Sequence, residues 1–268
     1  MKFLDNIVTE KRREVTAKRA LVSLPALIER AKLPSSPRDF LGAISGGGII
    51  AELKARTPTI DSFTHSTSLP ELAATYQQNG AAAISIVADP ARFGTSLADV
   101  ARVRESVVLP VIAKDFVVDV YQIMEARAAG ADAVLLIVRL LDLERLKRFL
   151  ATTAELGMAA LVETHSEDEV LAAIAAGAHI IGINNRDLDT MTVSLDTTRR
   201  LAGLVPDDAI LISESGIQSR TDIDDLSACG ATAFLVGGSL LAAGDPAAAL
   251  RALTTPNTEH EREERALS

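Results

Sequence analysis

The sequence predicts an α/β protein, a (β/α)8 barrel with an N-terminal helical extension. From Ile49 onward, eight short apolar runs alternate with Ala-rich segments of helical spacing. Continuous apolar strands joined by helices indicate a parallel sheet that is covered on both faces. Eight such units in about 200 residues fit a closed TIM barrel better than an open doubly wound sheet, which usually has fewer strands.

Residues 1–45 are expected to form the extension, because their charges are dense and their apolar residues are sparse. The cationic run that starts at Lys11 is interpreted as the solvated face of an exposed helix, laced with salt bridges. Ser23 is expected to cap a second helix over Leu24–Ala31, which Pro34 and Pro37 end. We expect the extension to lie over one end of the barrel.

The barrel itself is predicted over residues 46–253. Its strands are predicted to begin near Ile49, Ala83, Pro110, Ala133, Ala159, Ile180, Ala209 and Thr232. Glycine follows several helical segments, as expected for the left-handed residue that ends many helices. These glycines are Gly80, Gly130, Gly157, Gly177 and Gly230. Residues 254–268 are polar and charged, which predicts a frayed tail or a short solvated helix.

Composition limits the classes of function. The net charge of −9, with 3% aromatic residues and no Trp, argues against a general nucleic-acid binder. No apolar run reaches the roughly 18 residues that span a bilayer, and no signal peptide is recognised. The only cysteine, Cys229, forms no internal disulfide and is expected to be a small buried helix residue. The histidines lack ligand spacing, so no metal site is predicted.

Polar residues follow the predicted strands, at the end of a barrel where active sites lie. The lysines and carboxylates predicted to face this mouth are Glu52, Lys54, Lys114, Glu163 and Glu214. Taken singly, each also fits a structural role such as a rim salt bridge. Polar groups at the ends of seven of the eight strands are much less expected by chance. His165, two residues after Glu163, is interpreted as loop surface.

Glycine-rich turns after the last two strands predict an anion site. Ser215-Gly216 follows the seventh strand, and Gly237-Gly238-Ser239 follows the eighth. Such turns let backbone N–H groups approach a phosphate closely, and barrel enzymes commonly bind phosphate there.

Together these residues resemble the indole-3-glycerol phosphate synthase family, the (β/α)8 carboxy-lyases of tryptophan biosynthesis. The matching segments are 50–54 (IAELK), 114–116 (KDF), 161–163 (LVE), 181–188 (IGINNRDL), 213–217 (SESGI) and 234–240 (FLVGGSL). The resemblance implies that 1-(2-carboxyphenylamino)-1-deoxyribulose 5-phosphate is converted to indole-3-glycerol phosphate, with loss of CO2 and water. It implies a small phosphorylated substrate, no cofactor, a cytoplasmic location, and a monomer or weak homodimer.

The resemblance also implies roles for the polar residues. Lys114 resembles the general acid that protonates the substrate carbonyl oxygen, and crowding by a second lysine is expected to lower its pKa. Glu163 resembles the acid/base partner in dehydration, and Lys54 would bind the substrate carboxylate. The residues that would position the lysines or orient substrate hydroxyls are Glu52, Asn184 and Glu214.

The remaining implied residues bind the substrate. The apolar wall around the anthranilate ring, which favours decarboxylation, would comprise Phe93, Phe116 and Leu135. The phosphate would be held by Ser215, Gly216, Gly237 and Gly238, and Arg186 would lie near the site. Two positions depart from the family's usual pattern in a loop expected to move during turnover. Thr57 replaces a serine, and Ile60 replaces a flexible residue.

Other functions remain open at this point. A phosphate-binding aldolase could use Lys114 to form a Schiff base. A non-catalytic ligand-binding relative is motivated by the altered loop at residues 57–61. Isomerases of the same pathway fit less well, because no cysteine ends the first strand.

Overall fold

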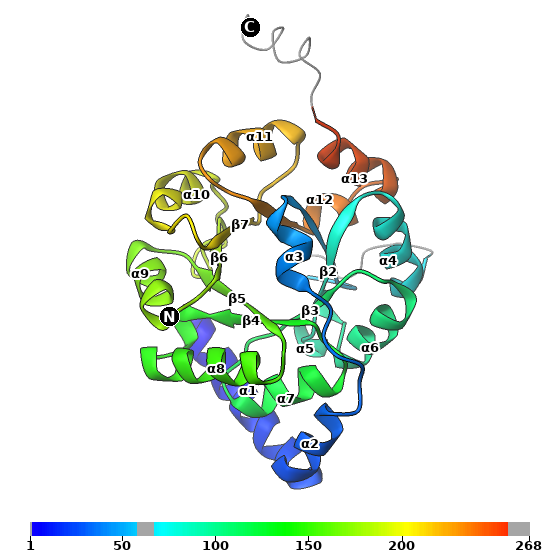
Figure 1. Cartoon of the computed structure of the whole chain (residues 1–268), viewed down its shortest axis with the longest axis vertical. Helices are drawn as coiled ribbons and strands as arrows, with labels where there is room; N and C mark the ends of the chain where they lie inside the picture. The colour runs from blue at the N-terminus through cyan, green and yellow to red at the C-terminus, as the bar shows by residue number, and fades with distance from the viewer. Residues whose placement is uncertain (1, 58–66, 257–268) are drawn as a thin grey trace, which may run out of the picture.

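The structure is a computed structural model that describes residues 2–57 and 67–256. Within these residues, eight parallel strands pair in sequence order, and the last pairs with the first to close a barrel (Figure 1). The predicted (β/α)8 fold is confirmed. The strands are β1 (Gly48–Leu53), β2 (Ala81–Val87), β3 (Val111–Lys114), β4 (Ala133–Ile137), β5 (Ala159–Thr164), β6 (Ile180–Asn184), β7 (Ile210–Glu214) and β8 (Ala233–Val236).

Helices surround the barrel and connect its strands (Figure 1). They are α4 (Leu69–Gln78), α5 (Pro90–Phe93), α6 (Leu97–Ser106), α7 (Val120–Ala128), α8 (Leu143–Glu155), α9 (Glu167–Ala176), α10 (Asp196–Leu201), α11 (Arg220–Ala228), α12 (Gly238–Leu241) and α13 (Pro246–Thr254), with 3-10 turns η1 (Val138–Leu140) and η2 (Ala202–Leu204). The glycines predicted to follow helices all adopt positive φ, from 72° at Gly157 to 105° at Gly230. A residue with a Cβ would be strained there.

Two apolar layers hold the barrel together. Alternate residues of each strand face the interior or the helices, because side chains alternate across a strand. The interior layer includes Ile50, Ile112, Leu135, Leu161 and Ile212. The outward-facing strand residues pack against the surrounding helices in a larger, separate cluster. This packing leaves the carboxyl ends of the strands to carry polar groups.

The N-terminal extension comprises α1 (Lys2–Leu21), α2 (Leu24–Ala31) and α3 (Phe40–Ser45). The Ser23 hydroxyl accepts a bond from the Ala26 N–H at 3.4 Å, as predicted for a helix cap. In α3, Phe40 and Ile44 are buried against the interior layer, and Figure 1 shows this helix lying across the barrel.

The extension does not lie over one end only, and that prediction was incomplete. While α3 packs against the interior layer, Lys11 of α1 reaches acidic residues beyond the carboxyl ends of β2 and β3. The connection between them passes along the outside of the barrel, where α2 packs against α7. The chain before β1 therefore contacts both ends.

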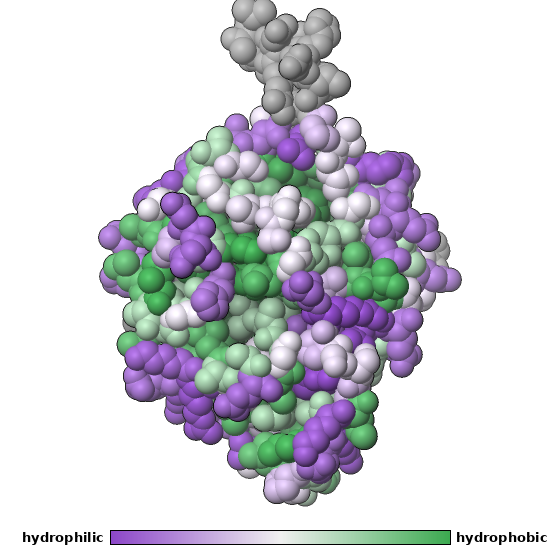
Figure 2. All heavy atoms as spheres, in the orientation of Figure 1, coloured by the Kyte–Doolittle hydropathy of each residue, from purple (hydrophilic) through white to green (hydrophobic). Residues whose placement is uncertain are grey.

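The surface on the α3 side is mixed. Hydrophilic residues occupy much of the outline of this face, and apolar residues gather towards its middle (Figure 2). No helix in the described part of the chain is both long and apolar enough to cross a bilayer. Cys229 was predicted to be buried within a helix, but it caps the end of α11 and is partly exposed.

Two predicted features fall largely outside the described residues. Ile60 lies in the undescribed stretch 58–66, and residues 257–268 of the predicted polar tail are likewise not described. Thr254, where that tail was predicted to begin, is the last residue of α13. The predicted division at residue 253 therefore stays a prediction.

Candidate active site

The predicted lysines and carboxylates converge at the carboxyl ends of the strands. Lys114, the last residue of β3, places its Nζ atom 2.7 Å from Oε2 of Glu214, 3.6 Å from Oε2 of Glu52 and 3.7 Å from Oε2 of Glu163. These residues come from β1, β3, β5 and β7. In such barrels, alternate strands contribute the side chains of one layer. The polar cluster is therefore one layer of the barrel, and it is built from charged groups.

Lys54 joins this cluster through Glu52. Its Nζ atom lies 2.5 Å from Glu52 Oε1 and 6.0 Å from the centre of the Phe93 ring. Glu52 thus contacts Lys54 with one carboxylate oxygen and faces Lys114 with the other. Burial raises the pKa of Glu52, but Lys54 and Lys114 outweigh burial and lower it to about 2. Glu52 is therefore ionised and attracts both lysines.

The pKa of Lys114 is raised, so the expectation of a lowered pKa was wrong. Burial does lower it, but Glu214, Glu52 and Glu163 outweigh burial. A second lysine nearby has less influence than a group of carboxylates in direct reach. Lys114 consequently stays protonated. It can donate a proton, but it lacks the free amine that a Schiff-base aldolase needs.

Glu214 is fully buried at the end of β7. Burial raises its pKa to about 7, with Glu163 and Glu52 adding to the effect and Lys114 opposing it. Its Oε1 atom has no hydrogen-bond partner within the described residues. A buried carboxyl oxygen without a partner is costly unless something polar binds it.

Glycines make room for these carboxylates. A Cβ on Gly182 of β6 would lie 2.2 Å from Glu214 Oε1, and a Cβ on Gly237 would lie 2.7 Å from Glu52 Oε1. Any larger residue at these positions would displace the carboxylates from the lysines. Gly182 was not among the predicted site residues, although a glycine inside a strand often marks a close approach of this kind.

The predicted polar residues after β6 serve the local loop. Asn184 is buried and its Oδ1 accepts a bond from the Arg186 N–H at 2.9 Å. The Arg186 side chain is exposed and donates to the Met191 carbonyl at 3.2 Å, so it does not join the cluster. Asn185, which was not predicted, is buried and donates to Ser213 Oγ and to the Ser215 carbonyl at 3.0 Å. It fixes the end of β7.

The predicted phosphate residues lie at the ends of neighbouring strands. Ser215 and Gly216 follow β7 with φ of 67° and 85°, while Gly237 and Gly238 follow β8. A positive φ in a non-glycine residue such as Ser215 is strained and is often found at functional sites. A Cβ on Gly238 would have open space within 4 Å. The turns therefore expose backbone on adjacent strand ends.

The predicted apolar wall is only partly assembled. Leu135 belongs to the interior layer of the barrel and Phe116 packs against that layer, while Phe93 ends α5 beside Lys54. Thr57 is partly buried just before the undescribed stretch.

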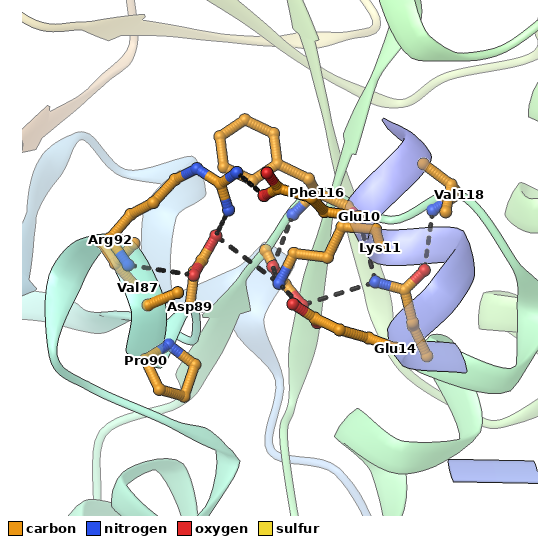
Figure 3. A network of polar contacts seen from close by, with 12 residues as sticks. Glu10, Lys11, Glu14, Val87, Asp89, Pro90, Arg92, Phe116 and Val118 are labelled. Carbon is orange, nitrogen blue, oxygen red and sulfur yellow. Dashed lines mark hydrogen bonds and ion pairs between the residues drawn. The ribbon is translucent and has the colours of Figure 1, made fainter. Parts of the chain in front are cut away.

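Lys11 connects the N-terminal helix to the rim of this site (Figure 3). Its Nζ atom lies 2.8 Å from Asp115 Oδ1, 3.5 Å from Asp89 Oδ2 and 3.3 Å from Glu14 Oε2. Asp89 also binds Arg92 at 2.9 Å and accepts from its N–H, so it begins α5.

The cationic run was interpreted as a solvated face, which is wrong for Lys11. Burial lowers the pKa of Lys11, but Asp115, Asp89 and Glu14 raise it overall. The sequence did contain the signal, because Lys11 is four residues from both Ile7 and Val15, which are buried on the same side of the helix.

His165 is also misplaced by the sequence interpretation, which assigned it to the loop surface. It is buried, with Nε2 3.4 Å from Glu163 Oε1 and Nδ1 3.2 Å from Glu169 Oε2. Because His165 is two residues after Glu163 in extended chain, both side chains point to the same face. That spacing was the available signal.

Comparison with known proteins identifies the family of the chain. The family model described as indole-3-glycerol phosphate synthase matches residues 4–253. The chain belongs to the indole-3-glycerol phosphate synthase family. An indole-3-glycerol phosphate synthase from Nocardioides sp. is 43% identical over 95% of this chain and 98% of its own length. One from Mycolicibacterium smegmatis is 42% identical over 95% of this chain and 94% of its own length.

Solved structures with much lower identity share the fold of this indole-3-glycerol phosphate synthase family member. An N-acetylmannosamine-6-phosphate 2-epimerase from Clostridium perfringens has a TM-score of 0.58 at 15% identity, covering 75% of this chain and 90% of its own. A thiamine phosphate pyrophosphorylase from Pyrococcus furiosus has a TM-score of 0.57 at 16% identity, covering 84% and 99% respectively. At such identities the likeness concerns the barrel alone.

Proposed function

We propose that this chain catalyses ring closure of 1-(2-carboxyphenylamino)-1-deoxyribulose 5-phosphate to indole-3-glycerol phosphate, with loss of CO2 and water, in tryptophan biosynthesis. The observation that carries the proposal is the charged layer in which Lys114 faces Glu52, Glu163 and Glu214. The reaction needs acids and bases around one carbonyl carbon, and this layer supplies them at the mouth of the barrel.

Lys114 is the proposed general acid of the first step. Its raised pKa keeps a proton on Nζ, which it gives to the substrate carbonyl oxygen as the aromatic carbon attacks the carbonyl carbon. The carboxylate on the attacking carbon then leaves as CO2, and its bonding electrons restore the aromatic ring. The apolar wall proposed around this ring is Phe93, Phe116 and Leu135, and apolar surroundings favour loss of a charged carboxylate.

Glu163 is the proposed acid/base partner in the dehydration that follows. It belongs to β5, which faces β1, the strand of Glu52, across the closed barrel. Lys54 would bind the substrate carboxylate before it leaves, and Glu52 would hold both lysines. Asn184 and Glu214 would orient the substrate hydroxyls, and the unpartnered Oε1 of Glu214 is a suitable acceptor.

The phosphate is proposed to bind at the ends of β7 and β8, where the turns expose backbone N–H groups. The proposed residues are Ser215, Gly216, Gly237 and Gly238. Thr57 would add a hydroxyl and Arg186 would act from the loop after β6. We further propose a cytoplasmic enzyme that is a monomer or weak homodimer, in keeping with a soluble phosphorylated substrate.

The test is an assay of the purified chain with this substrate, followed by indole absorbance and fluorescence. Product formation at micromolar enzyme is expected, and its absence would sink the proposal. Borohydride trapping with an aldehyde substrate addresses the aldolase alternative. No covalent adduct on Lys114 is expected, because its amine is protonated.

A further inference from the structure

The Glu163 carboxylate lies between two cationic neighbours, one near each of its oxygens. Oε2 is 3.7 Å from Lys114 Nζ, and Oε1 is 3.4 Å from His165 Nε2. The site proposed above uses Lys114 but gives His165 no role. His165 Nε2 is buried and has no hydrogen-bond partner within the described residues. A small movement of either ring or carboxylate would bring it into hydrogen-bond range of Glu163.

The other side of the imidazole is held firmly. Glu169 Oε2 lies 3.2 Å from His165 Nδ1 and also accepts the His165 backbone N–H at 2.8 Å. Glu169 Oε1 accepts a bond from Arg139 Nε at 2.9 Å. Side-chain exposure rises along this series, from 3% at Glu163 and 4% at His165 to 14% at Glu169 and 26% at Arg139. The series thus leads from the barrel interior to the surface.

These contacts fix how many protons the Glu163–His165 pair holds. Burial raises the pKa of Glu169, but His165 and Arg139 lower it overall, so Glu169 is an ionised acceptor and His165 Nδ1 carries a proton. If Nε2 and Glu163 were both unprotonated, a lone pair would face a carboxylate. One proton between them removes that repulsion, and it can reside on either His165 Nε2 or Glu163 Oε1.

We propose that His165 is a positioning residue that stores the exchangeable proton of Glu163 during dehydration. The inference rests on the acid/base role proposed for Glu163. Glu163 gives its proton to the departing hydroxyl, the C–O bond breaks with its electron pair on oxygen, and water leaves. The neighbouring carbon loses its proton to the released water as the ring double bond forms. His165 Nε2 then returns a proton to Glu163 Oε1 and takes one from solvent, which balances the proton that the carbon released.

The charges around His165 support a stored proton. Burial lowers the pKa of His165 and Arg139 lowers it further, but Glu169 and Glu163 outweigh both and raise it above its usual value of about 6.5. Lys114 faces the other carboxylate oxygen of Glu163, Oε2. These contacts therefore favour the protonated form of the imidazole.

Two substitutions separate this role from simple packing. In His165→Gln the amide reaches the place of Nε2 and keeps a donor towards Glu163, but it cannot release a proton. In His165→Asn the amide replaces Nδ1 and keeps the contact with Glu169, but nothing faces Glu163. His179→Gln is the matched control, since His179 is exposed and precedes β6, at the opposite end of the barrel from His165.

Single-turnover kinetics with labelled substrate would follow CO2 release and indole formation separately. For both His165 variants we expect indole formation to slow by about 10- to 100-fold, with CO2 release and KM within about 3-fold of wild type. The control should match wild type in both. Equal slowing of CO2 release and indole formation, or normal rates in both variants, would overturn the proposal. A wild type that forms no indole would instead overturn the proposed function.

A second measurement does not depend on turnover. Titration of the histidine ring signals by NMR should give a lower pKa for His165 in Glu163→Gln than in wild type, because a negative neighbour is removed. An unchanged His165 titration would show that the pair shares no proton, and would overturn the proposal even if the kinetic variants were impaired.

Discussion

Lys114 Nζ and Glu214 Oε2 lie 2.7 Å apart at the ends of β3 and β7, strands that stand opposite each other in the closed barrel. The contact therefore spans the mouth of the barrel and forms only when the sheet is closed. It also joins a lysine whose pKa is raised to a carboxyl whose pKa is raised to about 7. The acid strength of the site is thus a property of the assembled layer.

Replacing Lys114 by methionine should reduce kcat by at least about 100-fold, because the proposed proton donor is lost and nothing nearby replaces it. Steady-state indole fluorescence would measure this. Lys147→Met is the control, since Lys147 is exposed on α8 and binds Glu144 at 3.3 Å. Retention of more than a tenth of wild-type kcat in Lys114→Met would argue against a general-acid role.

Glu214 should make wild-type stability depend on pH. Its folded-state pKa of about 7 exceeds the ordinary 4.5, so the folded state holds more protons between these values. The free energy of unfolding therefore falls as pH rises through this window, by on the order of 3 kcal/mol. Glu214→Gln lacks this loss. Glu52, whose pKa is about 2, changes its protonation below this pH window and is present in both proteins.

Urea denaturation of wild type and Glu214→Gln at about pH 5, 6, 7 and 8 would measure the difference. The variant should gain relative to wild type as pH rises to 7, and the difference should then level off. Parallel stability curves would show that Glu214 ionises in the folded protein as it does in the unfolded chain.

Gly182→Ala should impair the site without an obvious change in fold. The new Cβ would lie 2.2 Å from Glu214 Oε1 and 2.9 Å from Leu161 Cδ1, so Glu214 must move away from Lys114. We expect kcat to fall by about 10-fold or more, with a loss of stability of about 1–3 kcal/mol from overpacking. Gly203→Ala is the control, because a Cβ there meets nothing within 4 Å. Equal activity of the two variants would contradict this prediction.

Lys11→Met should destabilise the protein by about 3–5 kcal/mol, because Asp89 and Asp115 lose the cation that is buried between them. It should also raise KM, because the two carboxylates adjoin residues of the proposed apolar wall. Asp89 begins α5, which ends at Phe93, and Asp115 precedes Phe116. Lys18→Met is a matched control on the same helix. Lys18 binds Glu125 at 3.0 Å but is 44% exposed, so its loss should cost about 1 kcal/mol or less.

Chemical denaturation and substrate titration of both α1 variants would test this. If Lys11→Met and Lys18→Met were equally stable and had equal KM, the buried ion pairs of α1 would have no role in shaping the site.

Local patterns were enough to predict the barrel and most of the charged layer. Apolar runs of strand length, helical spacing between them and terminal glycines each report on a few neighbouring residues. The barrel rule then places Glu52, Lys114, Glu163 and Glu214 at one mouth, because their strands are parallel. The sequence could not place Lys11 against Asp115, since more than 100 residues separate them and α1 had no predicted docking site.

What the sequence by itself determined was the order of strands and helices and the kinds of chemical group at the strand ends. These follow from periodicity and from the alternation of side chains along a strand. Only the tertiary structure decided the protonation states, because a pKa depends on which charges and how much water surround a group in space. Lys114 shows the difference. The sequence predicted a proton donor with a lowered pKa, and the closed barrel surrounds it with Glu52, Glu163 and Glu214, which raise it.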